Sequence, residues 1–228
     1  MPFTTEQFLR VFESYNHAVY PAQFALIILA LISVYLTIRA RPSSSRLIAV
    51  LLAAQWAWTG VVYHLAFFTR INRAAYIFGL LFIAQAALFI FAGLRRKLIF
   101  RARMDRIGIV GAGFIIYALL IYPALGLLSG HVYPRSPTFG VPCPTTIFTF
   151  GLLLWTERRV PLYLLLIPFL WSLMGLSAAL VLGVSEDIGL FLAGVTGTSL
   201  ILLRNTLPPS SNVHTVRAAI KVIVKPLI

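Results

Sequence analysis

Long runs of apolar residues recur along the chain, and short polar segments separate them. A helix that crosses the roughly 30 Å core of a bilayer needs about 20 mostly apolar residues. Seven stretches meet or approach that length: 18–38, 47–68, 74–94, 107–129, 145–156 with the segment leading into it, 161–183 and 188–203. The pattern predicts an all-α, polytopic transmembrane bundle of seven helices.

The fifth stretch is the shortest of the seven. Pro142 and Pro144 flank Cys143 at its start, and proline is tolerated only in the first turn of a helix. We therefore expect regular helix to begin at Pro144. Without this span the bundle has six helices, and the C-terminal part of the chain is inverted in the membrane.

The basic residues are distributed unevenly among the segments between the spans. With the N-terminus outside, all but four of the 19 lysines and arginines fall on the inner side, and the four are Arg10, Arg70, Arg73 and Arg135. Cytoplasmic loops of membrane proteins carry an excess of such residues. The distribution predicts seven spans with the N-terminus outside and the C-terminus cytoplasmic.

The last part of the chain is predicted to be separate from the bundle. Residues 1–205 form the transmembrane domain. Residues 206–228 mix apolar side chains with Arg217, Lys221 and Lys225, which are four residues apart. Such spacing favours a basic, amphipathic cytoplasmic tail that lies on the inner leaflet, with docking to a partner as the alternative.

Composition agrees with a membrane protein. Hydrophobic residues make up 60% and charged residues 11% of the 228 positions, whereas soluble domains have about 45–50% and about 25%. A net charge of +13 would suit nucleic acid, but the basic residues flank apolar spans and do not form one surface stripe. The expected partner is therefore the lipid bilayer and no nucleic acid. The single cysteine, Cys143, excludes an intramolecular disulfide.

The second span has one continuous polar and aromatic face. Gln55, Thr59 and Tyr63 recur every four residues, and His64 lies in the neighbouring row. Such a face meets other helices or a wet cavity and not lipid tails. His64 has two interpretations: it donates a hydrogen bond to a carbonyl and joins helices, or it serves as a ligand or proton carrier.

Polar residues of several loops also fall on the outer side. The segment 142–146 combines two prolines, which favour extended backbone, with the start of a helix. Irregular backbone at membrane depth is tolerated only inside protein or along a cavity, so this segment is either a structural turn or a ligand site. The sequence predicts an outward-facing polar pocket whose candidate residues are Gln55, Trp58, Thr59, Tyr63, His64, Asn72, His131, Cys143, Thr145, Thr146, Glu186 and Asp187.

The chemistry of these candidates leaves several alternatives open. His64, His131 and Cys143 with Glu186 or Asp187 are residue types that bind Zn²⁺ or Cu⁺, but no closely spaced pair anchors such a site. Cys143 as a nucleophile with His64 as its base requires hydrogen-bond reach between them. No cofactor motif is recognisable. No charged residue needs to lie deep in a span, which argues against proton-coupled transport.

Four stretches of the sequence resemble those of a known protein family: Tyr15-Asn16 with Pro21 and Gln23, residues 58–85, residues 140–149, and residues 183–187. They resemble an uncharacterised family of small bacterial multi-pass membrane proteins that has only a domain-of-unknown-function label. The resemblance covers most of residues 1–205 and implies a bacterial inner-membrane protein. It brings no activity, cofactor or catalytic residue.

Four functions are compatible with this pattern. The leading hypothesis is a membrane protein whose outward-facing polar pocket binds a small ligand or ion. The second is a facilitator or channel for a small neutral solute, lined by Gln55, Thr59 and Gln85. The others are a membrane-embedded enzyme that uses His and Cys or a metal, and an accessory subunit of a membrane complex. A homo-oligomer is compatible with each of them.

Overall fold

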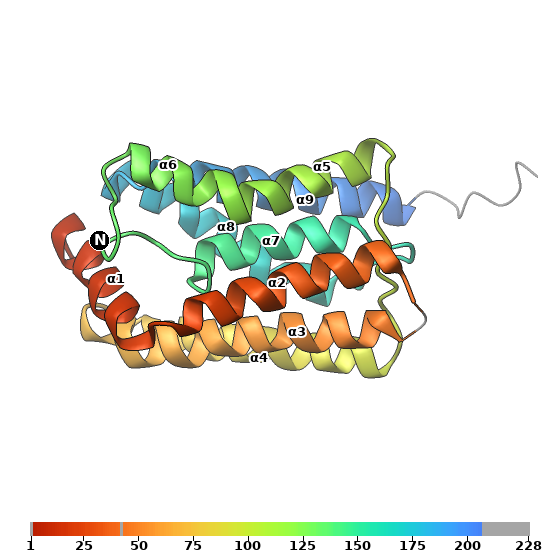
Figure 1. Cartoon of the computed structure of the whole chain (residues 1–228), viewed down its shortest axis with the longest axis horizontal. Helices are drawn as coiled ribbons and strands as arrows, with labels where there is room; N and C mark the ends of the chain where they lie inside the picture. The colour runs from red at the N-terminus through yellow and green to blue at the C-terminus, as the bar shows by residue number, and fades with distance from the viewer. Residues whose placement is uncertain (1, 42, 207–228) are drawn as a thin grey trace, which may run out of the picture.

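The predicted all-α architecture is confirmed for residues 2–41 and 43–206, which this computed structural model describes. Figure 1 shows the helices packed side by side in one bundle, with α1 at one end. The helices are α1 (Thr5–Val19), α2 (Ala22–Arg39), α3 (Ser44–Trp58), α4 (Ala75–Leu94), α5 (Arg106–Ile116), α6 (Tyr122–Leu128), α7 (Pro142–Leu154), α8 (Tyr163–Leu182) and α9 (Ile188–Thr206). Of the predicted basic tail, residues 207–228 lie outside the described residues.

Two helices continue through wider, π-helical turns. Helix α3 passes into a π-helical segment at Thr59–Phe67 and a short 3₁₀ turn at Phe68–Arg70. Helix α5 passes through Tyr117–Ile121 into α6. A π-helical turn rotates the side chains that follow it relative to an α-helix, and such turns are frequent at functional sites. The first of them carries Tyr63 and His64.

Within the described residues, six helical segments are long and apolar enough to cross a membrane. They are Ala22–Arg39, Ser44–Arg70, Ala75–Leu94, Arg106–Leu128, Tyr163–Leu182 and Ser185–Thr206. The first begins at Ala22 and not at residue 18, because Pro21 interrupts the helical backbone after α1. The bundle of membrane-capable helices is thus confirmed, while the expected fifth span takes a different form.

That fifth span is the short central helix α7, which has 13 residues. At 1.5 Å per residue it extends about 20 Å, less than the roughly 30 Å of a bilayer core. It begins at Pro142 and not at Pro144, because both prolines fit within the first turn, where backbone N–H groups have no helical acceptor. Every residue of α7 except Cys143 is buried, so neighbouring helices enclose it.

The linkers between helices bring the arginine-rich segments together at one end of the bundle. Backbone N–H groups of the segment between α4 and α5 donate to neighbours from three other segments: Ala102 to the Thr37 carbonyl at 3.2 Å, Phe100 to Ser45 Oγ at 3.0 Å, and Arg101 to the Trp155 carbonyl at 2.7 Å. These contacts join the C-terminal ends of α2, α4 and α7 and the N-terminal end of α3. Helix α1 lies at the other end (Figure 1).

Arg204, near the end of α9, closes the C-terminus of α7. Its guanidinium donates to the carbonyls of Leu154 at 3.2 Å and Thr156 at 3.0 Å, and to Thr156 Oγ1 at 2.8 Å. The last carbonyls of a helix have no partner within the helix itself, and water is scarce around a buried helix end. A cation at this position satisfies the carbonyls and complements the helix dipole.

Helix α1 is an element that the sequence analysis missed. Thr4 and Gln7 form a reciprocal capping box at its start, which is a recognisable sequence signature. Its apolar face buries Phe8, Phe12 and Tyr15 against the end of the bundle. Burial raises the pKa of Tyr15 to about 12, so its hydroxyl stays neutral where it accepts a 2.8 Å bond from Trp58 Nε1.

Close approach of α5 and α7 depends on two glycines that face each other. A Cβ placed on Gly151 would lie 2.7 Å from Ile115 Cγ1 and 2.9 Å from the Gly111 carbonyl oxygen. Both distances are shorter than real Cβ contacts, and one of them is to backbone, which cannot move aside. Small residues allow helix backbones to pack closely in this way.

Gly151→Ala is expected to lower the free energy of unfolding by about 1–3 kcal/mol, because the added methyl overpacks the α5–α7 interface. Gly113→Ala is the matched control, since a Cβ at Gly113 meets nothing within 4 Å and alanine favours helix. Thermal denaturation in detergent measures both variants. Equal melting temperatures for them would contradict the tight interface.

Candidate functional site

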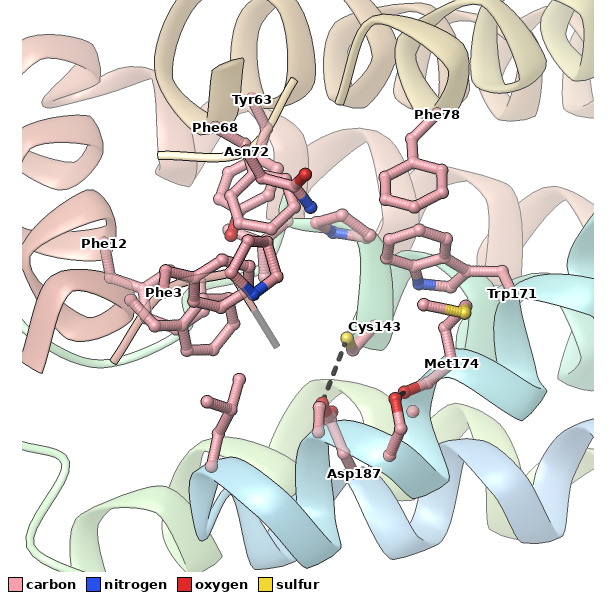
Figure 2. A pocket seen from close by; sticks show the side chains of 18 residues that line it. Phe3, Phe12, Tyr63, Phe68, Asn72, Phe78, Cys143, Trp171, Met174 and Asp187 are labelled. Carbon is pink, nitrogen blue, oxygen red and sulfur yellow. Dashed lines mark hydrogen bonds between the residues drawn. The ribbon is translucent and has the colours of Figure 1, made fainter. Parts of the chain in front are cut away.

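A cavity lies beneath α1, at the end of the bundle away from the arginine-rich segments. Its volume is about 140 Å³. It is lined by residues from the N-terminal segment, α1, the π-helical segment and turn after α3, helices α4, α7 and α8, and the turn before α9. Figure 2 shows the lining side chains directed into one space. Because α1 contributes part of the lining, the docking of α1 forms the cavity.

Aromatic residues form a large part of its wall: Phe3, Phe8, Phe12, Tyr63, Phe68, Phe78 and Trp171. They support one another edge to face or stacked. Phe3 packs at 5.5 Å from Phe68, Phe12 at 5.9 Å from Tyr63, and Phe78 at 5.3 Å from Trp171, measured between ring centroids. Such packing holds the rings in fixed positions.

Cys143 and Asp187 form a polar side of the same cavity. Cys143 Sγ donates to Asp187 Oδ2 at 3.4 Å (Figure 2), and Tyr122 Oη donates to Asp187 Oδ1 at 2.6 Å. Cys143 is in the first turn of α7, and Asp187 is in the turn that precedes α9. The sequence analysis named Cys143 and Asp187 but missed Tyr122, which lies inside an apolar span and gives no local signal.

Asp187 is a buried carboxylate without a cationic partner. Its exposed fraction is 1%, and the structure contains no ion pair from a described lysine, arginine or histidine to it. A buried charge that lacks a counter-charge is costly in free energy. Asp187 lies in the short 3₁₀ turn that precedes α9 and not deep within a long helix, so its burial does not contradict the expectation that no charged residue needs to lie deep in a span.

Glu186 and His131 form a separate pair beside the cavity. Glu186 Oε1 lies 2.9 Å from His131 Nδ1, and the Glu186 carbonyl accepts a 2.8 Å bond from Tyr117 Oη. Neither Glu186 nor His131 lines the cavity. The pair joins the loop after α6 to the turn before α9, so its role is to fix the loops that enclose Asp187.

His64 is buried among aromatic rings. Its ring centroid lies 4.8 Å from that of Phe82 and 5.1 Å from that of Trp171, and neither nitrogen has a hydrogen-bond partner among the described residues. The expected bond from His64 to a carbonyl is absent there. His64 and Cys143 are also not hydrogen bonded, so the nucleophile and base of the enzyme hypothesis are not paired.

The remaining candidates divide between the cavity and the helix interfaces. Tyr63 and Asn72 line the cavity. Thr59 Oγ1 donates to the Gly140 carbonyl at 3.1 Å and Thr146 Oγ1 to the Pro142 carbonyl at 2.8 Å. The interface residues, none of which lines the cavity, are Gln55, Trp58, Thr59, Thr145 and Thr146.

Metal binding finds no support in this arrangement. Within residues 2–41 and 43–206, no three side chains of histidine, cysteine, aspartate or glutamate gather closely enough to hold an ion. Cys143 with Asp187 and His131 with Glu186 remain two separate pairs. The predicted residues therefore converge on one end of the bundle without forming a metal centre.

The fold and its apolar helices define a helical protein of the multi-pass membrane class. Residues 5–212 match a family described as "Family of unknown function (DUF6064)", and the chain belongs to that family. No curated protein and no solved structure matches the chain. The resemblance to an uncharacterised family is confirmed, while its bacterial origin stays a prediction.

Polar contacts anchor α1 over the cavity. Glu6 forms an ion pair with Arg135 of the loop after α6 and another with Arg10 at 3.0 Å. Asn16 Nδ2 donates to the carbonyls of Pro134 at 2.6 Å and Ser136 at 2.8 Å. These bonds connect α1 to the loop between α6 and α7, which also leads to Cys143.

The pH dependence of stability should report the Glu6 contact. Arg135 and then Arg10 hold the pKa of Glu6 below its ordinary value. A lowered carboxyl pKa contributes stability above the unfolded pKa, about 4.3, and this contribution is lost as pH falls through the folded pKa. We expect wild type to melt at a higher temperature than Glu6→Gln at about pH 6. This difference should shrink as pH falls below about 4.3 and vanish once pH is below the folded pKa of Glu6. A pH-independent difference would contradict the assignment.

Proposed function

We propose that this chain crosses the bacterial inner membrane seven times, with α1 and the cavity on the outer side and the arginine-rich end in the cytoplasm. The six long apolar helices supply six passes, and α7 is the seventh. Its 13 residues suffice because surrounding helices cover it and no lipid contact is required along its length. The excess of arginines at one end favours this orientation.

Cysteines at three linkers test the seventh pass. Three variants, each made in a Cys143→Ser background, carry one cysteine. Arg73→Cys places it before α4, Lys97→Cys after α4, and Arg158→Cys after α7. If α7 crosses, a membrane-impermeant maleimide labels Arg73→Cys in intact spheroplasts, whereas Lys97→Cys and Arg158→Cys react only after permeabilisation. Labelling of Arg158→Cys from outside together with Arg73→Cys would show six passes.

We further propose that the cavity binds a small organic ammonium ion. The observation that carries this proposal is the buried Asp187 carboxylate, which has no cationic partner among the described residues and faces an aromatic wall. Aromatic faces attract cations through the ring quadrupole, and this is how proteins recognise quaternary ammonium groups. A bound cation also relieves the cost of the buried negative charge.

A polar end on the ligand would complete the fit. The indole N–H of Trp171 lines the cavity and has no hydrogen-bond acceptor among the described residues. A buried donor without an acceptor costs free energy, so an oxygen on the ligand would stabilise the complex. The proposed ligand class is thus a small amino alcohol or similar ammonium compound.

Two compounds of the same shape and different charge separate recognition of a cation from simple apolar filling. Choline carries the ammonium group, and 3,3-dimethylbutan-1-ol is its neutral isostere. We expect choline, at about 100 times its Kd, to stabilise wild type by about 2.7 kcal/mol, which raises the melting temperature by several degrees. We expect the neutral alcohol to have little effect.

Substitution of the carboxylate completes this test. Asp187→Asn keeps the shape of the side chain, removes its charge and should abolish the response to choline. Glu13→Gln removes a carboxylate from the same end but outside the cavity, and it should respond as wild type does. Equal stabilisation by both compounds, or an unchanged response in Asp187→Asn, would contradict an ammonium site.

The facilitator hypothesis receives less support from the contacts. Gln85 Nε2 donates to the Leu164 carbonyl at 3.1 Å and Thr59 Oγ1 to the Gly140 carbonyl at 3.1 Å. Two of the three residues expected to line a path are therefore bonded across helix interfaces. A role as an accessory subunit or homo-oligomer stays a prediction.

A further inference from the structure

A second cavity is lined by residues of the turn between α2 and α3, and Figure 1 shows this turn at the end of the bundle opposite α1. Its volume is about 620 Å³, and the turn before α3, the segment after α4 and the segment after α7 line it. We call it the basic cleft, because its lining includes Arg41, Arg46, Arg96, Arg101 and Arg158.

The positive charge of the basic cleft is largely uncompensated. Glu157 is the one acidic residue in the lining, and its Oε1 is bound to Arg101 Nε at 2.9 Å. In the part of the chain that the structure describes, the other four arginines form no ion pair. Like charges gathered around one hollow repel each other and attract an anion.

The floor of the basic cleft is apolar. Leu98 and Phe100 are 3% and 1% exposed, and both line the cleft together with Ile99. The Phe100 N–H donates to Ser45 Oγ at 3.0 Å, which fixes this floor against the first turn of α3. Just outside the cleft, Ile38 of α2 and Leu94 of α4 are exposed apolar side chains.

We infer that the basic cleft binds the phosphate headgroup of an anionic phospholipid. Arginine is suited to this ligand because its planar guanidinium donates two parallel hydrogen bonds to phosphate oxygens. Basic pockets at the ends of transmembrane helices are known to hold such headgroups. The exposed apolar surface of α2 and α4 favours a lipid over a free phosphate, since acyl chains attached to the headgroup can lie along it.

This inference is independent of the ammonium site, which lies at the other end of the bundle. Its test compares wild type in nanodiscs of phosphatidylcholine alone with nanodiscs that also contain phosphatidylglycerol. We expect phosphatidylglycerol to raise the melting temperature by several degrees. The double variant Arg46→Gln/Arg158→Gln should fold, because both side chains are exposed, and should lose at least half of that gain.

The control keeps the same change of charge at the same end of the bundle. Arg106→Gln/Arg159→Gln replaces two exposed arginines that do not line the cleft, and it should keep the full gain. An equal loss in both double variants would show general charge attraction and overturn the site. Absence of any gain in wild type would overturn it as well.

Inorganic phosphate separates the two sources of the anion. Millimolar phosphate added to phosphatidylcholine nanodiscs should leave the melting temperature of wild type unchanged. If it reproduces the gain seen with phosphatidylglycerol, and Arg46→Gln/Arg158→Gln abolishes that gain, the occupant is a free phosphate and not a lipid.

Discussion

The architecture depends on enclosing a short helix, α7, at the centre of an apolar bundle. A helix of 13 residues presents unsatisfied N–H and carbonyl groups at both ends, and neither end has free access to water. Arg204 and the N–H of Arg101 satisfy the C-terminal end. At the other end, prolines replace N–H groups that would need acceptors. The surrounding helices are arranged to make these contacts.

Different forces shape the two ends of the bundle. At the end with α1, aromatic rings and a few polar bonds line a small cavity that holds a buried carboxyl group, Asp187. At the other end, exposed arginines surround a larger cleft with an apolar floor. The proposed ligands follow this difference: a cation suits an aromatic cavity with one negative charge, and an anionic headgroup suits guanidinium groups.

Three of the predicted site residues illustrate the limits of pattern analysis. Cys143 and Asp187 are 44 positions apart. The sequence predicts that they lie at the same end of the bundle, but their 3.4 Å contact cannot be predicted from it. His64 is packed among aromatic rings, and its nitrogens have no hydrogen-bond partner among the described residues. Periodicity gives the direction of a side chain relative to its own helix, and the partners come from other helices.

The sequence alone determined which segments are apolar helices, because burial of about 20 apolar residues in lipid is a local property of composition. It also predicted which linkers share an end, because successive long helices are expected to run in opposite directions and arginines mark alternate linkers. Only the tertiary structure decided that α7 is enclosed, that α1 covers a cavity, and that Asp187 shares this cavity with aromatic rings and has no cationic partner among the described residues. These features depend on contacts between residues far apart in the chain, and such contacts leave no periodic signal in any one segment.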